Sequence, residues 1–399
     1  MKILLINSVL GIGSTGRIVE SLYKSLKSVG HDVKVAYGRN KYLGIITQDQ
    51  FCFYNKLNIN LHGVFSRIFD NSGLAYSKKA TKKLIKFIED FKPDVVNLHN
   101  LHGYYLNVPL LLNYLAEKNI KCVFTLHDCW LLTGHCTNVC FNQCEGFSNN
   151  CENCKFKHVY PKSLLFNKSA KNLELKQKLL SKINNKSFIV PSNWLKNYVA
   201  KSYLKNEKID VVYNSINFNI FNQNSKNNYD KTKLPCDKYI LCVSNVWNEQ
   251  KGIKKIVELA RFATDKKFVL VGQLKCKIEL PQNVIHIEQT NNAKELAFYY
   301  ANAELLFNPT LEDVFGLVTA EAMACGIPVL LYKGCSGGED AIKTFSGYAI
   351  DKTSSTEEVT KSIDDIKQNF NAEKTIQNIK TLCSDKKFYQ DYIRILEER

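Results

Sequence analysis

The chain has 399 residues, of which 45% are hydrophobic, so it is long enough for two packed domains. No apolar run reaches the roughly 20 residues that span a bilayer, and the first apolar run lacks the cleavage site of a secretion signal, so we expect a cytoplasmic protein. Residues 1–190 carry a net charge of +14 out of the total of +16, which favours an anionic partner: nucleic acid, a membrane surface or a phosphorylated acceptor.

Short apolar runs alternate with helical patterns along almost the whole chain. Runs rich in Val and Ile, separated by helical segments of about 10 to 20 residues, predict parallel sheets buried on both faces. The expected strands are residues 2–7, 33–37, 94–99, 122–127, 187–192 and 209–214 in the first half, and 239–244, 267–272, 284–287, 304–309, 328–332 and 347–350 in the second.

A polar, Asn-rich stretch without periodicity, residues 217–237, separates the two halves and is expected to be a linker. The sequence therefore predicts an α/β chain of two doubly wound, Rossmann-like domains, residues 1–216 and 238–379. The amphipathic end of the chain predicts a helix within about 380–399 that packs back on the first domain. Ligands of such domains bind beyond the carboxyl ends of the strands, so we expect a cleft there.

The first strand is followed by Gly11-Ile12-Gly13-Ser14-Thr15-Gly16, a G-x-G-x-x-G pattern. In a dinucleotide-binding domain the first glycine follows the strand closely and an acidic residue closes the second strand. Here Asn7-Ser8-Val9-Leu10 intervene, and the second strand ends at Tyr37-Gly38-Arg39 without a carboxylate. An NADP enzyme with Arg39 on the 2′-phosphate remains an alternative. The loop still presents N–H groups at a helix N-terminus, so we expect it to bind a phosphate.

Histidines follow two of the expected strands. His99 and His102 come at and just after the end of residues 94–99, and His127-Asp128 come at the end of residues 122–127. Because strand ends of an α/β sheet face the ligand side, these side chains are candidates for the lining of a site. The alternative is that they are hydrogen-bonded histidines of the core.

The chain contains 14 cysteines, and five of them lie in residues 135–156. Cys151 and Cys154 have the spacing of half a tetrahedral zinc site, which Cys136 and Cys144 would complete. A structural zinc ion would order a loop that has few apolar residues. The alternative is a set of reduced, unliganded thiols packed beneath the loop.

Residues 308–329, NPTLEDVFGLVTAEAMACGIPV, place two acids, Glu312 and Asp313, in a loop after a strand and Glu321 about two turns down the following helix. This stretch resembles the donor-binding signature of family 4 glycosyltransferases, retaining enzymes of the GT-B fold. Further blocks in the same order resemble the bacterial capsule and exopolysaccharide (colanic-acid-type) branch of that family. They are residues 13–39, 95–107, 124–136, 189–195, 211–221 and 248–260.

The resemblance implies roles for individual residues. Glu321 would accept hydrogen bonds from the ribose hydroxyls, and either Asp313 or Glu312 would hold the sugar hydroxyls. Where the family has an arginine five residues before its lysine, this chain has Val246, so Arg17 or Asn245 is expected to substitute. The remaining assignments are Lys251 and the N–H groups of Phe315, Gly316, Leu317, Gly11, Gly13 and Gly16 on the diphosphate, His127 near the transferred sugar, and His99, His102 and Asp128 on the acceptor side.

The resemblance implies a retaining transfer of a sugar from a nucleotide diphosphate sugar to a lipid-linked glycan acceptor in surface-polysaccharide biosynthesis. The basic first half favours an enzyme held at the anionic inner face of the plasma membrane. No Asp-x-Asp occurs in the chain, so we expect no divalent metal in catalysis. One alternative is a GT-B epimerase or phosphorylase. Another is a basic zinc- or nucleic-acid-binding protein; it would not explain residues 308–329, so we expect no nucleic-acid partner.

Overall fold

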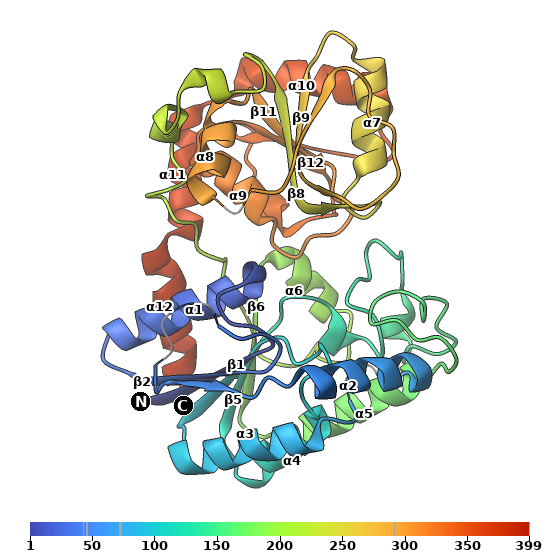
Figure 1. Ribbon diagram of the computed structural model, residues 1–399, viewed down its shortest axis with the longest axis vertical. Helices are drawn as coiled ribbons and strands as arrows, with labels where there is room; N and C mark the ends of the chain where they lie inside the picture. Colours follow the sequence, from blue (N-terminus) through green and yellow to red (C-terminus); the bar gives the residue numbers. More distant parts are fainter. Residues whose placement is uncertain (43, 45–46, 72–73, 291, 399) are drawn as a thin grey trace. The chain divides into compact units, whose positions relative to one another are not determined.

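The computed structural model describes all residues except 43, 45–46, 72–73, 291 and 399. The chain forms two compact units. Unit 1 comprises residues 1–191, 195–212 and 389–399, and unit 2 comprises residues 192–194 and 213–388. Each unit is built on its own parallel sheet with helices on both faces (Figure 1), which confirms the predicted α/β architecture.

In the described part of unit 1, the strands form one parallel sheet with the order β3-β2-β1-β4-β5-β6-β7. The strands are β1 (Lys2–Asn7), β2 (Asp32–Tyr37), β3 (Gln50–Cys52), β4 (Val95–Leu98), β5 (Lys121–Thr125), β6 (Lys186–Val190) and β7 (Ile209–Val211). The helices are α1 (Gly13–Ser28), α2 (Lys56–Phe69), α3 (Lys78–Phe91), α4 (Val108–Glu117), α5 (Ser169–Ser181), α6 (Asn193–Val199) and α12 (Asp385–Glu397), with short 3₁₀ turns η1 (Trp130–Leu132) and η2 (Gly146–Ser148). Helix α6 begins where the chain passes between the two units.

The central strands of unit 1 are buried along almost their whole length because helices cover both faces of the sheet. All four residues of β4 are buried, and in β1 only Lys2 is exposed. In Figure 1, α3 and α4 lie on one side of this sheet and α1 on the other. Helix α3 is amphipathic: Leu84, Ile88 and Phe91 face the core, while its lysines are exposed.

In the described part of unit 2, the sheet order is β10-β9-β8-β11-β12-β13, again parallel. The strands are β8 (Ile240–Trp247), β9 (Phe268–Leu274), β10 (Val284–Ile287), β11 (Leu305–Asn308), β12 (Val329–Tyr332) and β13 (Gly347–Ile350). The helices are α7 (Ile253–Phe262), α8 (Ala293–Asn302), α9 (Leu317–Ala324), α10 (Thr356–Asn369) and α11 (Ala372–Cys383), with 3₁₀ turns η3 (Gln223–Asn227), η4 (Lys231–Lys233) and η5 (Gly337–Ala341).

Two apolar cores cover the two faces of this second sheet. Alternate residues of one strand enter different cores: Leu241 packs with α8, α9 and α11, whereas Ile240 and Cys242 pack with α7 and α10. This alternation is the reason that the strands are continuous apolar runs rather than alternating ones.

The stretch expected as a linker, residues 217–237, lies in unit 2 and is packed against it. Phe221 is buried in the core beside Tyr300, and the ring of Tyr229 packs on Phe298 of α8. These aromatic side chains give a polar stretch enough apolar contact to fold against α8, which is why the division falls at residues 212–213.

The end of α12 belongs to unit 1. The hydroxyl groups of Ser21 and Tyr389 are 2.7 Å apart, and Lys121 Nζ donates to the carbonyl oxygens of Ile395 and Leu396 at 2.8 and 3.1 Å. The lysine thus caps the carboxyl end of α12, where the helix dipole favours a cation. Among the described residues, no helix is both long and apolar enough to cross a membrane.

Candidate functional site

The sheet order of unit 2 reverses between β8 and β11, and the loops that follow these two strands meet there. Lys251 follows β8 and Asp313 follows β11, and Lys251 Nζ lies 3.1 Å from Asp313 Oδ2. Ligands of doubly wound sheets bind at such a reversal, beyond the carboxyl ends of the strands. Two residues predicted to bind the donor are therefore brought together at the position where this fold takes ligands.

Asp313 also organises the loop that leads into α9. Its Oδ1 accepts hydrogen bonds from the backbone N–H groups of Gly316 and Phe315, at 3.0 and 3.3 Å. Desolvation alone would raise the pKa of Asp313, but the ammonium group of Lys251 and these N–H groups outweigh it and lower the pKa below its usual value. Asp313 is therefore ionised at neutral pH.

Glycines start the two helices beside this pair. Gly252 precedes α7 with φ +77°, and Gly316 precedes α9 with φ +78°. A Cβ at Gly252 would lie 2.2 Å from the carbonyl oxygen of Pro309, and one at Gly316 would lie 2.9 Å from Ser336 Oγ. Neither helix start has a hydrogen bond from a side-chain cap in the described structure. Backbone N–H groups at such a start, including that of Leu317, favour an anion.

Glu321 lies farther along α9 and is half-buried. The hydroxyl of Tyr300, a fully buried residue of α8, donates to Glu321 Oε2 at 3.1 Å. Glu312 is placed differently: it is buried, and its carbonyl oxygen accepts hydrogen bonds from Gln250 and Thr310. Of the two candidate first acids, Asp313 is thus the one that meets Lys251.

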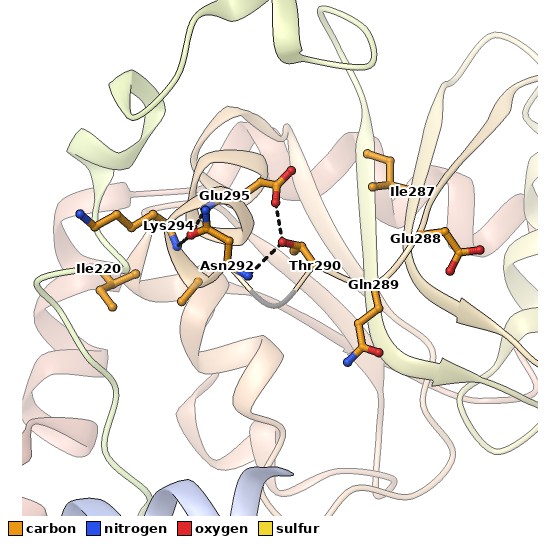
Figure 2. Close-up of a pocket in the computed structure, with 9 residues that line it drawn as sticks. Ile220, Ile287, Glu288, Gln289, Thr290, Asn292, Lys294 and Glu295 are labelled. Carbon is orange, nitrogen blue, oxygen red and sulfur yellow. Dashed lines mark hydrogen bonds between the residues drawn. The ribbon is translucent and has the colours of Figure 1, made fainter. Parts of the chain in front are cut away.

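Asn245, near the carboxyl end of β8, accepts a hydrogen bond from the side chain of Gln289. Gln289 also lines an open pocket of about 830 Å³ at the carboxyl end of β10 (Figure 2). In this pocket the Thr290 hydroxyl hydrogen-bonds Glu295, and Asn292 Oδ1 accepts from the N–H of Lys294 at 3.0 Å. The polar side chains of the wall are therefore hydrogen-bonded to one another, and Ile220 and Ile287 supply an apolar part.

In unit 1 the glycine loop follows β1, at the point where that sheet order reverses between β1 and β4. Gly11 and Gly13 have φ of +71° and +63°, and the Gly11 N–H donates to the carbonyl of Gly16 at 3.1 Å. Helix α1 begins at Gly13 with exposed Ile12 before it and no side-chain cap hydrogen bond. Arg17 is exposed on the first turn of α1. The loop thus leads into an uncapped helix start, and its binding of a phosphate stays a prediction.

The loops after β4 and β5 bring the four predicted acceptor-side and catalytic residues together. His99 Nδ1 and His127 Nε2 are 2.9 Å apart, and His102 Nε2 and Asp128 Oδ2 are 2.6 Å apart. Burial lowers the pKa of His127 to about 4 and holds the pKa of His99 well below its usual value. Both rings are therefore neutral at pH 7. Desolvation would raise the pKa of Asp128, but His102 and the Trp130 N–H outweigh it and lower it.

Two side chains that the sequence pattern did not assign to this site, Tyr160 and Arg39, lie near His102. The ring of Tyr160 is 6.0 Å from the ring of His102, and Arg39 hydrogen-bonds Tyr160. Arg39 passes close to Gly103, where a Cβ would lie 3.0 Å from Arg39 Cδ. Arg39 was singled out only as a possible 2′-phosphate ligand, and no local signal marked Tyr160.

Lys176 of α5 is buried beneath this region. Its Nζ donates to the carbonyl oxygens of Trp130 and Thr133 at 2.6 and 2.7 Å and lies 3.6 Å from the centre of the Trp130 ring. Lys176 thereby fixes η1, whose first N–H donates to Asp128 Oδ1 at 2.8 Å. No sequence pattern singled out this lysine.

The four cysteines predicted to bind zinc lie near one another. The thiols of Cys136 and Cys154 are hydrogen-bonded, and this bond lowers the pKa of Cys154 to about 6 while raising that of Cys136. Desolvation raises the pKa of both Cys144 and Cys151, and each of them interacts with Cys154. No group of three or more His, Cys, Asp or Glu side chains among the described residues is arranged to hold a metal as it stands.

Two family models match the chain. The model described as Glycosyltransferase Family 4 matches residues 15–219, and the model described as Glycosyl transferases group 1 matches residues 224–382. The first match covers about half of the chain. It begins within the glycine loop, so it contains Gly16 but not Gly11 or Gly13, and it contains the acceptor-side histidines and the cysteine cluster. The second contains Lys251, Asp313 and Glu321.

Similar proteins agree with these models. The O-antigen chain mannosyltransferase RfbU of Salmonella typhimurium is 27% identical over 157 residues, which are 37% of this chain and 42% of RfbU. An uncharacterized 42.6 kDa protein in the cps region of Klebsiella pneumoniae is 24% identical over 354 residues, which are 83% and 84% of the two chains. The structure of HepE from Anabaena, in complex with UDP and glucose, aligns with all of both chains at a TM-score of 0.67 and 14% identity. This likeness confirms the predicted GT-B fold.

Proposed function

The chain belongs to glycosyltransferase family 4, and from that premise we propose that it transfers a sugar from a nucleotide diphosphate sugar to a glycan acceptor during the biosynthesis of a surface polysaccharide. The observation that carries this proposal is the pair of Lys251 and Asp313 at the strand reversal of unit 2, with Glu321 farther along α9. A cation, helix N–H groups and carboxylates are the groups that recognise a diphosphate, a ribose and a hexose.

In the proposed donor complex, Lys251 and the N–H groups of residues 315–317 bind the diphosphate, and the N–H groups of Phe315 and Gly316 leave Asp313 Oδ1 to do so. Glu321 accepts from the ribose hydroxyls while Tyr300 holds its carboxylate in place. Asp313 holds hydroxyls of the transferred sugar. A UDP-sugar is the first donor to test, because HepE binds UDP and glucose. This chain has Val246 where the family has an arginine, and the variant Arg17→Ala tests whether Arg17 takes that role. Binding of nucleoside diphosphate should weaken in the variant, and unchanged binding would show that Arg17 is not part of the site.

We propose that the transfer retains the anomeric configuration. The bond between the anomeric carbon and the diphosphate oxygen breaks, the acceptor oxygen bonds to the same face, and the leaving phosphate oxygen takes the acceptor proton. Lys251 and the α9 N–H groups stabilise the negative charge that develops on the diphosphate. No carboxylate is left for a nucleophile in this assignment, since Asp313 and Glu321 bind hydroxyl groups. Activity is expected without added Mg²⁺ or Mn²⁺, because the sequence holds no Asp-x-Asp.

On the acceptor side, we propose that His127 approaches the transferred sugar and that His102 and Asp128 bind the acceptor. Arg39 and Tyr160 extend this set by a cation and an aromatic face, which suit a phosphate and a sugar ring. The acceptor is expected to be a lipid-linked glycan at the anionic inner face of the plasma membrane. The net charge of +14 in residues 1–190 supports this expectation.

A thermal-shift panel of UDP, GDP, ADP and CMP tests the donor class directly. We expect one nucleoside diphosphate to raise the melting temperature of the wild type and to have a much smaller effect on Lys251→Met and Glu321→Gln. Incubation of the matching nucleotide sugar with membrane lipid extracts then tests transfer. Release of nucleotide without acceptor would favour an epimerase, a phosphate-dependent reaction would favour a phosphorylase, and no shift with any nucleotide would overturn the proposal.

We also propose that Cys136, Cys144, Cys151 and Cys154 hold a structural zinc ion after small rearrangements of their loop. The mutual proximity of the four thiols supports this set, and thiolates are preferred zinc ligands. Total metal analysis of the purified protein should give about one zinc per chain. Absence of zinc from protein purified without chelators would leave the thiols as buried, reduced side chains.

A further inference from the structure

Most of the exposed large apolar side chains in the described structure lie in two segments of unit 1. On α2, Leu57 is 69% exposed and Leu61 is 48% exposed, and in the loop before α5, Leu165 is 66% exposed. The remaining members are Val64 and Phe65 on α2 and Leu164 and Phe166 in the loop. Isolated exposed apolar residues are ordinary, but a contiguous group of large ones marks a surface that contacts something apolar.

These two segments form one surface. The N–H of Leu164 donates to the carbonyl of Arg67 in the last turn of α2, at 2.7 Å. The rings of Phe69 and Phe166 stack with centroids 5.8 Å apart, and Lys168 Nζ lies within 5.8 Å of both ring centres. The loop is thus fastened to the carboxyl end of α2. We call the exposed side chains of residues 57–65 and 164–166 the apolar surface.

The exposed face of α2 is held outward by packing on its other face. His62, Gly63 and Ser66 are buried. His62 Nδ1 lies 2.7 Å from the hydroxyl oxygen of Ser77, and Asn55 caps the start of α2 by accepting from the N–H of Asn58 at 2.8 Å. Leu57, Leu61 and Val64 recur at helical spacing on the opposite face. Helix α2 is therefore docked on unit 1 with an apolar stripe facing solvent.

The segments that form the apolar surface are rich in cations and contain no acid. Neither residues 50–69 nor residues 153–173 contain an Asp or a Glu, whereas they contain seven cations. These are Lys56, Arg67, Lys155, Lys157, Lys162, Lys168 and Lys171. Four acids border these ranges. Asp70 is fully buried against His135 and Asp49 pairs with Lys27, whereas Glu152 and Glu174 are exposed, so the cations still outnumber the exposed acids by seven to two. A second copy of this chain would oppose cations with cations, so the surface does not complement itself.

We propose that the apolar surface and its ring of lysines dock unit 1 on a bilayer that contains anionic lipid, with the leucines and phenylalanines in the headgroup region. A helix with an exposed apolar face, flanked by lysines and without acids, has the composition of interfacial membrane helices. Each cation near an anionic leaflet adds to the binding, and the leucines add the apolar part.

The same loop reaches the proposed acceptor site. Tyr160, four residues before Leu164, lies against the ring of His102, and Arg67 of α2 lies 5.6 Å from the ring of Tyr104. A lipid-linked glycan would therefore present its sugar close to His102 and Asp128. This last step rests on the proposed function; the docking itself rests only on the exposed side chains and charges.

Vesicle flotation tests the docking with three preparations: phosphatidylcholine, phosphatidylcholine with about 30% phosphatidylglycerol, and the latter in 0.5 M NaCl. The wild type should bind the anionic vesicles at least about tenfold more tightly than the neutral ones, and salt should reduce binding by a similar factor. The variant Leu57→Gln/Leu61→Gln/Leu165→Gln should lose about tenfold or more. The control Val29→Gln/Phe262→Gln, which removes exposed apolar side chains elsewhere, should bind as the wild type.

Two variants with the same change in net charge test whether binding depends on the lysines at this surface or on the net charge of the protein. Lys56→Glu/Lys162→Glu/Lys171→Glu should abolish binding, whereas Lys82→Glu/Lys83→Glu/Lys86→Glu on α3, with the same change in charge, should keep most of it. All six lysines are exposed, so both proteins should fold. Equal losses in the two charge variants, equal binding to neutral and anionic vesicles, or no binding by the wild type would each overturn the proposal. Nucleotide thermal shifts, measured on the same proteins, report the proposed function separately, since all of these residues lie outside the donor site.

Discussion

The buried Lys176 allows a quantitative test of the packing beneath the acceptor-side histidines. Burial lowers the pKa of Lys176 to about 7, against 10.5 for a solvated lysine. Between these two values the unfolded chain binds one proton more than the folded chain, so this lysine makes stability rise with pH from about 7 to 10.5. From pH 7 to pH 9 the rise in the free energy of unfolding is about 2 kcal/mol, at about 1.4 kcal/mol per unit of pH difference.

Lys176→Met removes this contribution while keeping the length of the side chain. Urea unfolding of wild type and variant at pH 7, 8 and 9, followed by circular dichroism, should show the stability of the wild type gaining about 2 kcal/mol on the variant across the series. Only the transition of unit 1 should move. The control Lys178→Met alters an exposed lysine of the same helix and should leave the pH dependence unchanged. Parallel curves for wild type and Lys176→Met would show that Lys176 is not buried in the way described.

Three further predictions concern the candidate site. Lys251→Met should weaken the binding of nucleoside diphosphate by about 1.5–3 kcal/mol, about 10- to 150-fold, because a charge-assisted contact to phosphate is lost. Titration calorimetry measures the affinity, and an unchanged value would exclude Lys251 from the donor site. Gly316→Ala should lower the free energy of unfolding by about 1–2 kcal/mol, because alanine is strained in the left-handed conformation. The new Cβ would also crowd Ser336 Oγ at 2.9 Å. The variant should therefore have a lower melting temperature and a smaller thermal shift with nucleotide. His127 has a folded pKa of about 4, below the usual 6.5, so it makes stability rise with pH across that window. His127→Gln should remove about 1.5 kcal/mol of the rise between pH 5 and 6.5, and a variant with the wild-type pH dependence would contradict the burial of this ring.

The strands were predictable because burial on both faces of a parallel sheet requires short runs of apolar residues. The run at residues 284–287 matches β10 without any difference in bounds, and the run at residues 2–7 matches β1. β3 was not predicted. Its three residues, Gln50–Cys52, form an edge strand with none of them buried, so no apolar run marks it.

The strands of the two sheets, the loop and helix of residues 308–329 and the glycines that start α1 and α9 were predictable from the sequence, because they depend on local patterns of burial and backbone conformation. Packing in three dimensions decided that Asp313 meets Lys251, and that His99 pairs with His127 while His102 pairs with Asp128. It also decided that residues 217–237 pack on α8 and that α2 keeps an apolar stripe in solvent. The physical reason is that these features depend on which strands are neighbours and which helix faces are covered, and sheet order and packing set both through contacts between residues far apart in the chain.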